Sequence, residues 1–201
     1  MKVASSFSVA APRQRVFAHF LDPDSMRACV PGCLELIRLD DTHYRGTLVN
    51  EVAHVRFAAA FTAEITELSA PSEVRALLRG EDRKLASSIK VDASLAVQSA
   101  AQTTSSVEFE LDLALWGRIG RLGESIIRRR SEEVQRQFVA DFARVCAAGP
   151  PGPDNPVVRE LLARPTRPTP ARAAKTDRAP RRRWWRRLLA LLTRRRAAVR
   201  R

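Results

Sequence analysis

The sequence predicts an α+β domain in which an antiparallel sheet packs against one long helix. Apolar residues alternate over several segments of the first 115 residues, and a helical apolar stripe follows over about 122–147. Apolar side chains make up 45% of the 201 residues, which is enough for one sizeable core. Because one face of such a sheet is apolar, it needs a cover, and the long helix is available to provide it.

The first elements are a strand and two short helices. Residues 3–9 alternate as a strand, and Pro12 suits the first turn of a helix that carries Val16, Phe17 and Phe20 at helical spacing. A second helix is predicted in the next ten residues, between the chain breaks at 22–23 and 31–32. Six strands are then predicted, near 34–40, 43–53, 55–65, 73–79, 85–97 and 107–115.

Charge divides the chain into two unlike parts. Residues 1–149 hold 19 basic and 19 acidic side chains, so the whole net charge of +13 lies in the last quarter. This distribution excludes a uniformly basic nucleic-acid-binding domain. We therefore expect a neutral domain over 1–148, a Pro- and Arg-rich linker over 149–180 and a basic terminal segment over 181–201. The linker is expected to be mostly extended, with one short helical turn at 157–163.

No secretory signal or spanning segment is visible in the sequence. The longest strongly apolar run is Leu188–Leu192, far below the roughly 20 residues of a spanning helix. Three cysteines are too few for a disulfide framework. The sequence therefore predicts a cytoplasmic protein whose membrane contact is peripheral.

The terminal segment 181–201 is the strongest chemical signal, with ten arginines and no acidic residue. On a helix, six apolar residues share an arc of roughly 160°, and four arginines lie opposite. The apolar residues are Trp184, Trp185, Leu188, Leu189, Leu191 and Leu192, and the arginines are Arg183, Arg186, Arg187 and Arg194. Tryptophan favours the headgroup boundary and arginine attracts anionic lipid, so this composition indicates an interfacial membrane anchor.

Two other partners for the terminal segment stay open. A polybasic segment binds nucleic acid, and an amphipathic helix docks into a partner protein's groove. The leucines of the apolar face argue against nucleic acid, because a segment that tracks phosphates has no use for them.

The order of elements resembles the helix-grip fold of the START/Bet v 1-like (SRPBCC) superfamily, in which a curved antiparallel sheet wraps a long C-terminal helix. Over about 1–147, four local motifs resemble the CoxG family of carbon monoxide dehydrogenase accessory proteins. They are Phe7-Ser8-Val9-Ala10-Ala11-Pro12 with Val16-Phe17, Leu21-Asp22-Pro23 before Cys29-Val30-Pro31-Gly32-Cys33, Tyr44-Arg45-Gly46-Thr47, and Trp116-Gly117-Arg118-Ile119-Gly120-Arg121-Leu122-Gly123. The Cys-x-Pro-Gly-Cys element is the most specific of them.

The resemblance implies a non-enzymatic accessory protein. Its partner would be the carbon monoxide dehydrogenase or a related molybdenum hydroxylase, and the chain would act at the cytoplasmic face of the cell membrane. No tightly bound cofactor is expected. The cargo would be a hydrophobic small molecule such as a prenylquinone, and the alternative is an adaptor that recruits the enzyme without binding a small molecule.

A ligand cavity is predicted between the long helix and the sheet. Small residues among large ones on the inward strand face leave space that a close-packed core would not have, although ordinary core packing explains the same pattern. Tyr44 and Trp116 carry a polar group on an aromatic body, which suits the orientation of a quinone-type ring. The candidate lining residues are Tyr44, Phe57, Phe61, Phe109, Trp116, Ile127, Phe138 and Phe142.

The cysteine pair and the histidines do not indicate catalysis or a metal site. Cys29 and Cys33 lack the second ligand pair of a zinc knuckle, so Pro31-Gly32 between them is expected to shape the turn into the next strand. The three histidines, His19, His43 and His54, have no sequence neighbours that would complete a triad.

Overall fold

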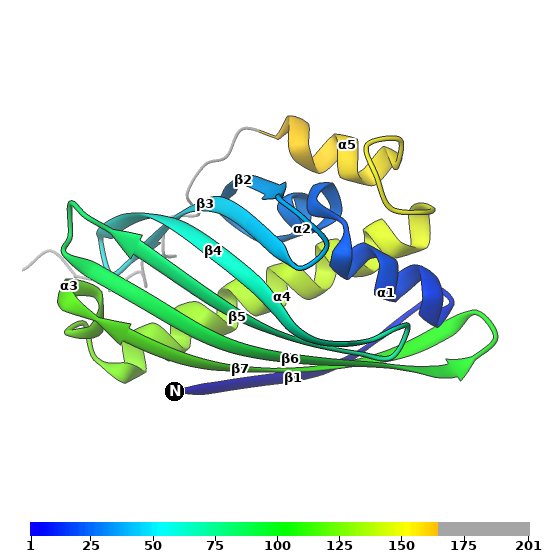
Figure 1. The fold of residues 1–201 in the computed structure, drawn as a ribbon, viewed down its shortest axis with the longest axis horizontal. Helices are drawn as coiled ribbons and strands as arrows, with labels where there is room; N and C mark the ends of the chain where they lie inside the picture. Colours follow the sequence, from blue (N-terminus) through cyan, green and yellow to red (C-terminus); the bar gives the residue numbers. More distant parts are fainter. Residues whose placement is uncertain (165–201) are drawn as a thin grey trace, which may run out of the picture. The chain divides into compact units, whose positions relative to one another are not determined.

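The computed structural model describes residues 1–164, which fold around one curved sheet (Figure 1). The first elements are β1 (Lys2–Val9), α1 (Arg13–Leu21) and α2 (Pro23–Cys29). The remaining strands are β2 (Cys33–Arg38), β3 (His43–Val52), β4 (Val55–Ser69), β5 (Glu73–Asp82), β6 (Ser87–Ala101) and β7 (Thr104–Trp116). The remaining helices are α3 (Gly117–Gly120), α4 (Glu124–Ala148) and α5 (Pro156–Ala163).

All seven strands form one antiparallel sheet in the order β1-β7-β6-β5-β4-β3-β2. The register aligns side chains into rows across the strands, such as Phe61, Gly80, Ile89 and Leu115. We call the face that contains these rows the inner face, because its members Phe7 and Phe109 pack on side chains of α4. The alternate residues form the outer face.

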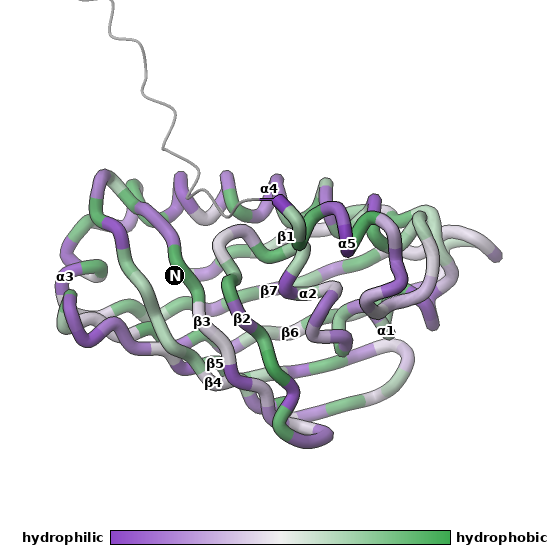
Figure 2. Tube along the Cα trace, turned by 90° about the horizontal axis from the view of Figure 1, so that it is seen from above, coloured by the Kyte–Doolittle hydropathy of each residue, from purple (hydrophilic) through white to green (hydrophobic). Residues whose placement is uncertain are grey.

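Helix α4 lies along the inner face of the sheet for its whole length (Figure 1). Hydrophilic and hydrophobic residues alternate along it with helical period, as Figure 2 shows. The predicted order of elements, a strand, two helices, six strands and a long helix, is confirmed. The α+β class and the curved antiparallel sheet on a long helix are confirmed with it.

The closed hydrophobic core lies at the end of the sheet covered by α1, α2 and α5. These helices and α4 contribute to it together with β1, β6 and β7, and its members are almost completely excluded from solvent. The most buried are Val9, Val16, Val97, Val107, Phe142, Val145, Cys146 and Val158.

The domain extends beyond the predicted boundary at 148. Residues 156–163 form α5, and its Val158 and Leu161 are buried in the core. Asn155 caps this helix, and its side-chain nitrogen also donates to the carbonyl oxygens of Val145 and Pro150, each at 3.0 Å. The expected start of the linker at 149 is therefore corrected, because burial and capping fix the short helix against α4. The rest of the predicted linker and the terminal segment lie outside the described residues.

Candidate functional site

Burial changes along α4 from one end of the helix to the other. Ile126, in its first turn, is 41% exposed, while Ile127 and Val134 are half-buried. Phe142 and Val145, near the last turn, are completely buried. The interface between helix and sheet is therefore closed at the end near α1 and leaves apolar surface accessible at the end near α3.

Three of the predicted lining residues form part of a closed aromatic cluster. Phe138 and Phe142 stack with ring centroids 5.3 Å apart, and Phe109 meets Phe138 edge-on at 6.2 Å. Phe7 and Phe20, which the sequence did not single out for this role, complete the cluster, with Phe20 4.2 Å from Phe142. Phe142 has no exposed surface, so it stabilises the fold rather than lining an accessible space.

Phe57 and Phe61 lie on the inner face of β4 and remain half-buried. Phe61 lies directly opposite Gly46 on β3, where a Cβ atom would come within 2.6 Å of the Phe61 ring. Glycine at 46 therefore lets this ring lie against the strand backbone. The two phenylalanines form an apolar surface away from the closed cluster.

Tyr44 is half-buried on β3, and its hydroxyl donates to the carbonyl oxygen of Leu21 at 3.1 Å. Burial raises the pKa of this phenol, so the group is neutral and acts as a donor at physiological pH. Its polar atom ties β3 to the end of α1. The structure therefore gives this hydroxyl a protein partner, instead of leaving it free to orient a ligand.

Trp116 and Ile127 are not brought together with the phenylalanines in the same way. Trp116 is 53% exposed and lies opposite Ser88, which places it on the outer face. The prediction that Trp116 lines the inner space is therefore wrong, because strand alternation turns it away from α4. Ile127 does lie half-buried on α4.

A polar cluster joins α4 to β3 among these apolar residues. The Nε and Nη2 atoms of Arg130 donate to Asn50 Oδ1 at 3.0 and 2.6 Å, and Nη1 donates to Glu133 Oε2 at 3.1 Å. The Arg130 side chain is only 11% exposed. The sequence analysis missed it, although an arginine inside the apolar stripe of α4 was a usable signal.

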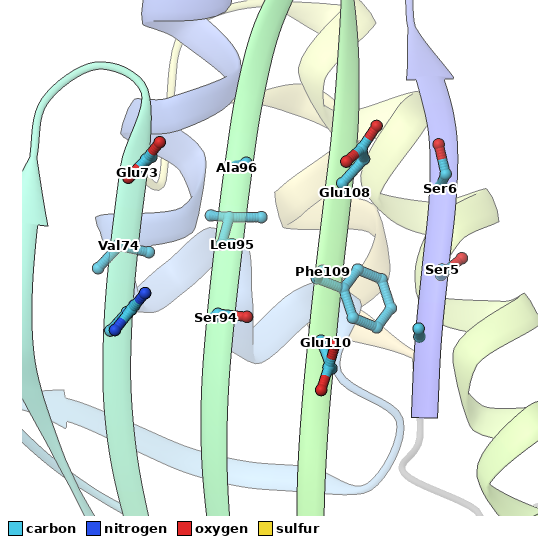
Figure 3. Close-up of a pocket in the computed structure, with 12 residues that line it drawn as sticks. Ser5, Ser6, Glu73, Val74, Ser94, Leu95, Ala96, Glu108, Phe109 and Glu110 are labelled. Atoms are coloured by element: carbon cyan, nitrogen blue, oxygen red, sulfur yellow. The ribbon is translucent and has the colours of Figure 1, made fainter. Parts of the chain in front are cut away.

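A hollow of about 600 Å³ lies at the opposite side of the sheet, across β5, β6, β7 and β1 (Figure 3). Most of its lining belongs to the outer face, including Glu73, Glu108 and Glu110. Phe109 is the one predicted lining residue among its walls. This hollow is open and acidic, so it does not suit an apolar ligand.

The cysteines of the Cys-x-Pro-Gly-Cys element are both buried free thiols. Burial raises the pKa of Cys29 to about 12 and that of Cys33 to about 11. Between them, Gly32 has a φ of +84°, and a Cβ there would come within 2.0 Å of the Val49 carbonyl oxygen. The element shapes the turn from α2 into β2, and its thiols are protonated and inert at neutral pH.

Polar side chains near α1 form a hydrogen-bonded network rather than a catalytic group. His19 is completely buried, with Nδ1 2.9 Å from Ser25 Oγ and Nε2 3.0 Å from the Gly149 carbonyl oxygen. Asp22 accepts from the Ser25 hydroxyl at 2.6 Å and from the Gly152 amide at 3.1 Å. Within residues 1–164, no cluster of His, Cys, Asp and Glu could hold a metal ion.

The predicted membrane-binding residues, from Arg183 to Arg194, all lie outside the part of the chain that the structure describes. Among the residues it does describe, no helix is both long and apolar enough to cross a bilayer.

The family model of CoxG, an accessory protein of carbon monoxide dehydrogenase, matches residues 5–147. The chain belongs to the CoxG family. The match includes the Cys-x-Pro-Gly-Cys element and the glycine-containing segment around α3, so the resemblance drawn from these motifs is confirmed. No curated protein matches the chain.

Solved structures show the same fold at low sequence identity. A conserved protein from Geobacillus kaustophilus matches with a TM-score of 0.67 and 15% identity, covering 73% of this chain and 95% of its own. A START superfamily protein from Mycobacterium smegmatis matches with a TM-score of 0.56 and 11% identity, covering 69% and 92%. Ara h 8.0201 matches with a TM-score of 0.51 and 11% identity, covering 74% and 99%. This CoxG-family chain therefore has the START/Bet v 1-like fold.

Proposed function

We propose that the chain binds a hydrophobic ligand, a respiratory quinone, between the first half of α4 and the inner face of the sheet. The observation that carries this proposal is the change of burial along α4, from half-buried Ile127 and Val134 to fully buried Phe142. Apolar side chains that keep exposed surface favour an apolar occupant, because covering them removes that surface from water.

The CoxG family suggests how the bound molecule is used. The protein would link a carbon monoxide dehydrogenase, or a related molybdenum hydroxylase, to the cytoplasmic surface of the cell membrane. The segment 181–201 would hold it at anionic lipid through its Trp and Leu side and its arginines. Both the enzyme and the membrane would then be partners of one non-catalytic protein.

Arg130 and Asn50 provide polar groups at the edge of the apolar surface. The side-chain oxygen of Asn50 accepts from Arg130 and from the Glu51 amide, at 2.9 Å for the amide. The guanidinium has five N–H donors, of which this network uses three. Its remaining donors suit the carbonyl oxygens of a quinone ring.

Ligand uptake is tested by incubating the full chain with vesicles that contain a prenylquinone, followed by re-isolation, solvent extraction and mass spectrometry. We expect near-stoichiometric retention. Co-sedimentation of the enzyme with vesicles in the presence of the chain, but with no quinone retained, would instead support an adaptor that binds no small molecule.

Membrane attachment is tested separately from ligand binding. Deletion of 181–201 should release the protein from anionic vesicles while its unfolding transition stays unchanged. Charge reversal of the segment's arginines should weaken binding mainly at low salt, and Trp184→Ala with Trp185→Ala should weaken it at high salt too. Vesicle binding that survives the deletion in full would refute the anchor.

A further inference from the structure

The neutral charge of the domain conceals a basic region at one of its ends. We call this region the α3 end and define it as the turn between β5 and β6, the end of β7, α3 and the first two turns of α4. Figure 1 shows these segments together, opposite α1 and α5, and a hydrogen bond from the Ile119 amide to Ser87 Oγ at 3.2 Å joins two of them. Its exposed basic residues are Arg83, Lys84, Arg118, Arg121, Arg128 and Arg129.

Few acidic groups compensate these charges. Glu124 pairs with Arg128 at 2.6 Å, and Glu133 lies 3.7 Å from Arg129. The carboxylate of Asp82 accepts hydrogen bonds from the backbone amides of Ala58 and Leu85. Among the described residues, the other four basic side chains of the α3 end form no ion pair within 4 Å, so their charge is available to an external anion.

Large apolar side chains are exposed between these charges. Trp116, at the end of β7, is 53% exposed, and Ile126, in the first turn of α4, is 41% exposed. A cluster of arginines alone fits any polyanion. Tryptophan and isoleucine among arginines instead match the boundary between lipid headgroups and acyl chains, where an indole ring and a cation both find partners.

We infer that the α3 end is a second membrane-contact surface, which places this end of the domain directly on anionic lipid. It acts independently of the segment 181–201. The outer face of the sheet is excluded as the contact, because Glu73, Glu108 and Glu110 would be repelled by the same lipids.

This orientation has a consequence for ligand exchange, which rests on the function proposed above. The apolar inner face is accessible near α3 and closed near α1, as the burial of Ile127 and Phe142 shows. Docking through the α3 end would turn the accessible part toward the bilayer. A quinone would then pass between membrane and protein over a short apolar route instead of through water.

The experiment compares two labels at the two ends of α4 in the full chain. Ser125→Cys and Ala148→Cys each place an exposed thiol there, and the three native thiols are buried and do not compete for the reagent. An NBD fluorophore on either cysteine reports contact with acyl chains. Roughly 34 Å separate the two positions along the helix, at about 1.5 Å per residue, so end-on docking affects only one of them.

With vesicles of phosphatidylcholine containing about 30% phosphatidylglycerol, we expect at least a twofold rise in emission at 125, quenched by brominated lipid, and no change at 148. Arg118→Glu with Arg121→Glu should remove at least half of that rise. The charge-matched control, Arg136→Glu with Arg159→Glu, lies outside the α3 end and should leave it unchanged.

The outcomes separate this inference from membrane attachment through the segment 181–201. Co-sedimentation with a silent label at 125, or an equal response at 148, overturns the inference and leaves that attachment intact. Absence of any co-sedimentation contradicts both. A response at 125 to DNA but not to vesicles would assign the surface to a different polyanion and likewise overturn the inference.

Discussion

The imidazole Nε2 of His19 lies 3.0 Å from the carbonyl oxygen of Gly149, which joins α1 to the turn that follows α4. Because a carbonyl only accepts, Nε2 carries the proton. The other ring nitrogen faces Ser25 Oγ, and Asp22 accepts from both Ser25 and the Gly152 amide. These contacts fix the turn that leads from α4 to α5.

The first prediction concerns the pH dependence of stability. Burial lowers the pKa of His19 below its ordinary value of 6.5, partly opposed by the bond to Gly149 and by Asp22. Above pH 6.5 the histidine is neutral in both states, and its contribution to stability is complete. As the pH falls below 6.5, the unfolded chain takes up the proton first, so the unfolding free energy falls by up to about 1.4 kcal/mol per pH unit.

This dependence is measured by urea unfolding between pH 5 and 8. His19→Gln should lower stability at pH 7.5 by on the order of 2 kcal/mol, because it disrupts buried hydrogen bonds, and should flatten the slope between pH 5 and 6.5. His54→Gln, which changes an exposed histidine, is the matched control and should preserve the slope. A slope that persists in full in the His19 variant would contradict this role.

The second prediction concerns the domain boundary. A chain ending at residue 164 should unfold at the same temperature as the full chain, because α5 and its capping residue Asn155 are retained. A chain ending at 148 loses Val158 and Leu161 from the core and should be less stable by several kcal/mol. Thermal unfolding followed by circular dichroism distinguishes them, and equal melting temperatures would contradict the docking of α5.

Period-two alternation predicted the sheet and the shared face of Phe57, Phe61 and Phe109, because such alternation depends only on local sequence. It could not predict which part of that face is closed. Closure depends on Phe7 and Phe20, which reach Phe142 from distant parts of the chain.

Other features of the site depended on distant contacts too. Val158 and Leu161 occur in a Pro-rich stretch that reads as a linker, and only the bridge from Asn155 to Val145 fixes the helix there. Trp116 has the composition of a ligand-orienting residue, but its position relative to Leu115 turns it to the outer face. His19 and Gly149 are 130 residues apart, so no sequence pattern connects them.

The third prediction concerns thiol reactivity. Cys29, Cys33 and Cys146 are buried, and burial raises the pKa of each thiol well above neutrality. A disulfide reagent such as DTNB should therefore react with none of them in the native protein at pH 8, and with all three in guanidinium chloride. Rapid reaction of either Cys29 or Cys33 in the folded protein would indicate an exposed, activated thiol instead.

The fourth prediction concerns the turn between the two cysteines. Gly32→Ala should destabilise the fold by at least about 1–3 kcal/mol, because alanine is strained at a φ of +84° and its Cβ would meet the Val49 carbonyl oxygen. Gly123→Ala is a useful comparison, since its φ is also positive but nothing lies within 4 Å of an added Cβ. Equal losses of stability would show that the contact with β3 contributes nothing.

The central claim, that an apolar molecule occupies the accessible part of the inner face, is tested most directly by two alanine-to-phenylalanine changes on β4. Ala63 is half-buried on the inner face, and Ala60, three residues earlier, is exposed on the outer face. Prenylquinone retained by each folded variant is measured by extraction and mass spectrometry. The account predicts that Ala63→Phe lowers retention at least fivefold and that Ala60→Phe leaves it unchanged; undiminished retention in Ala63→Phe, or no retention by the unaltered chain, would contradict it.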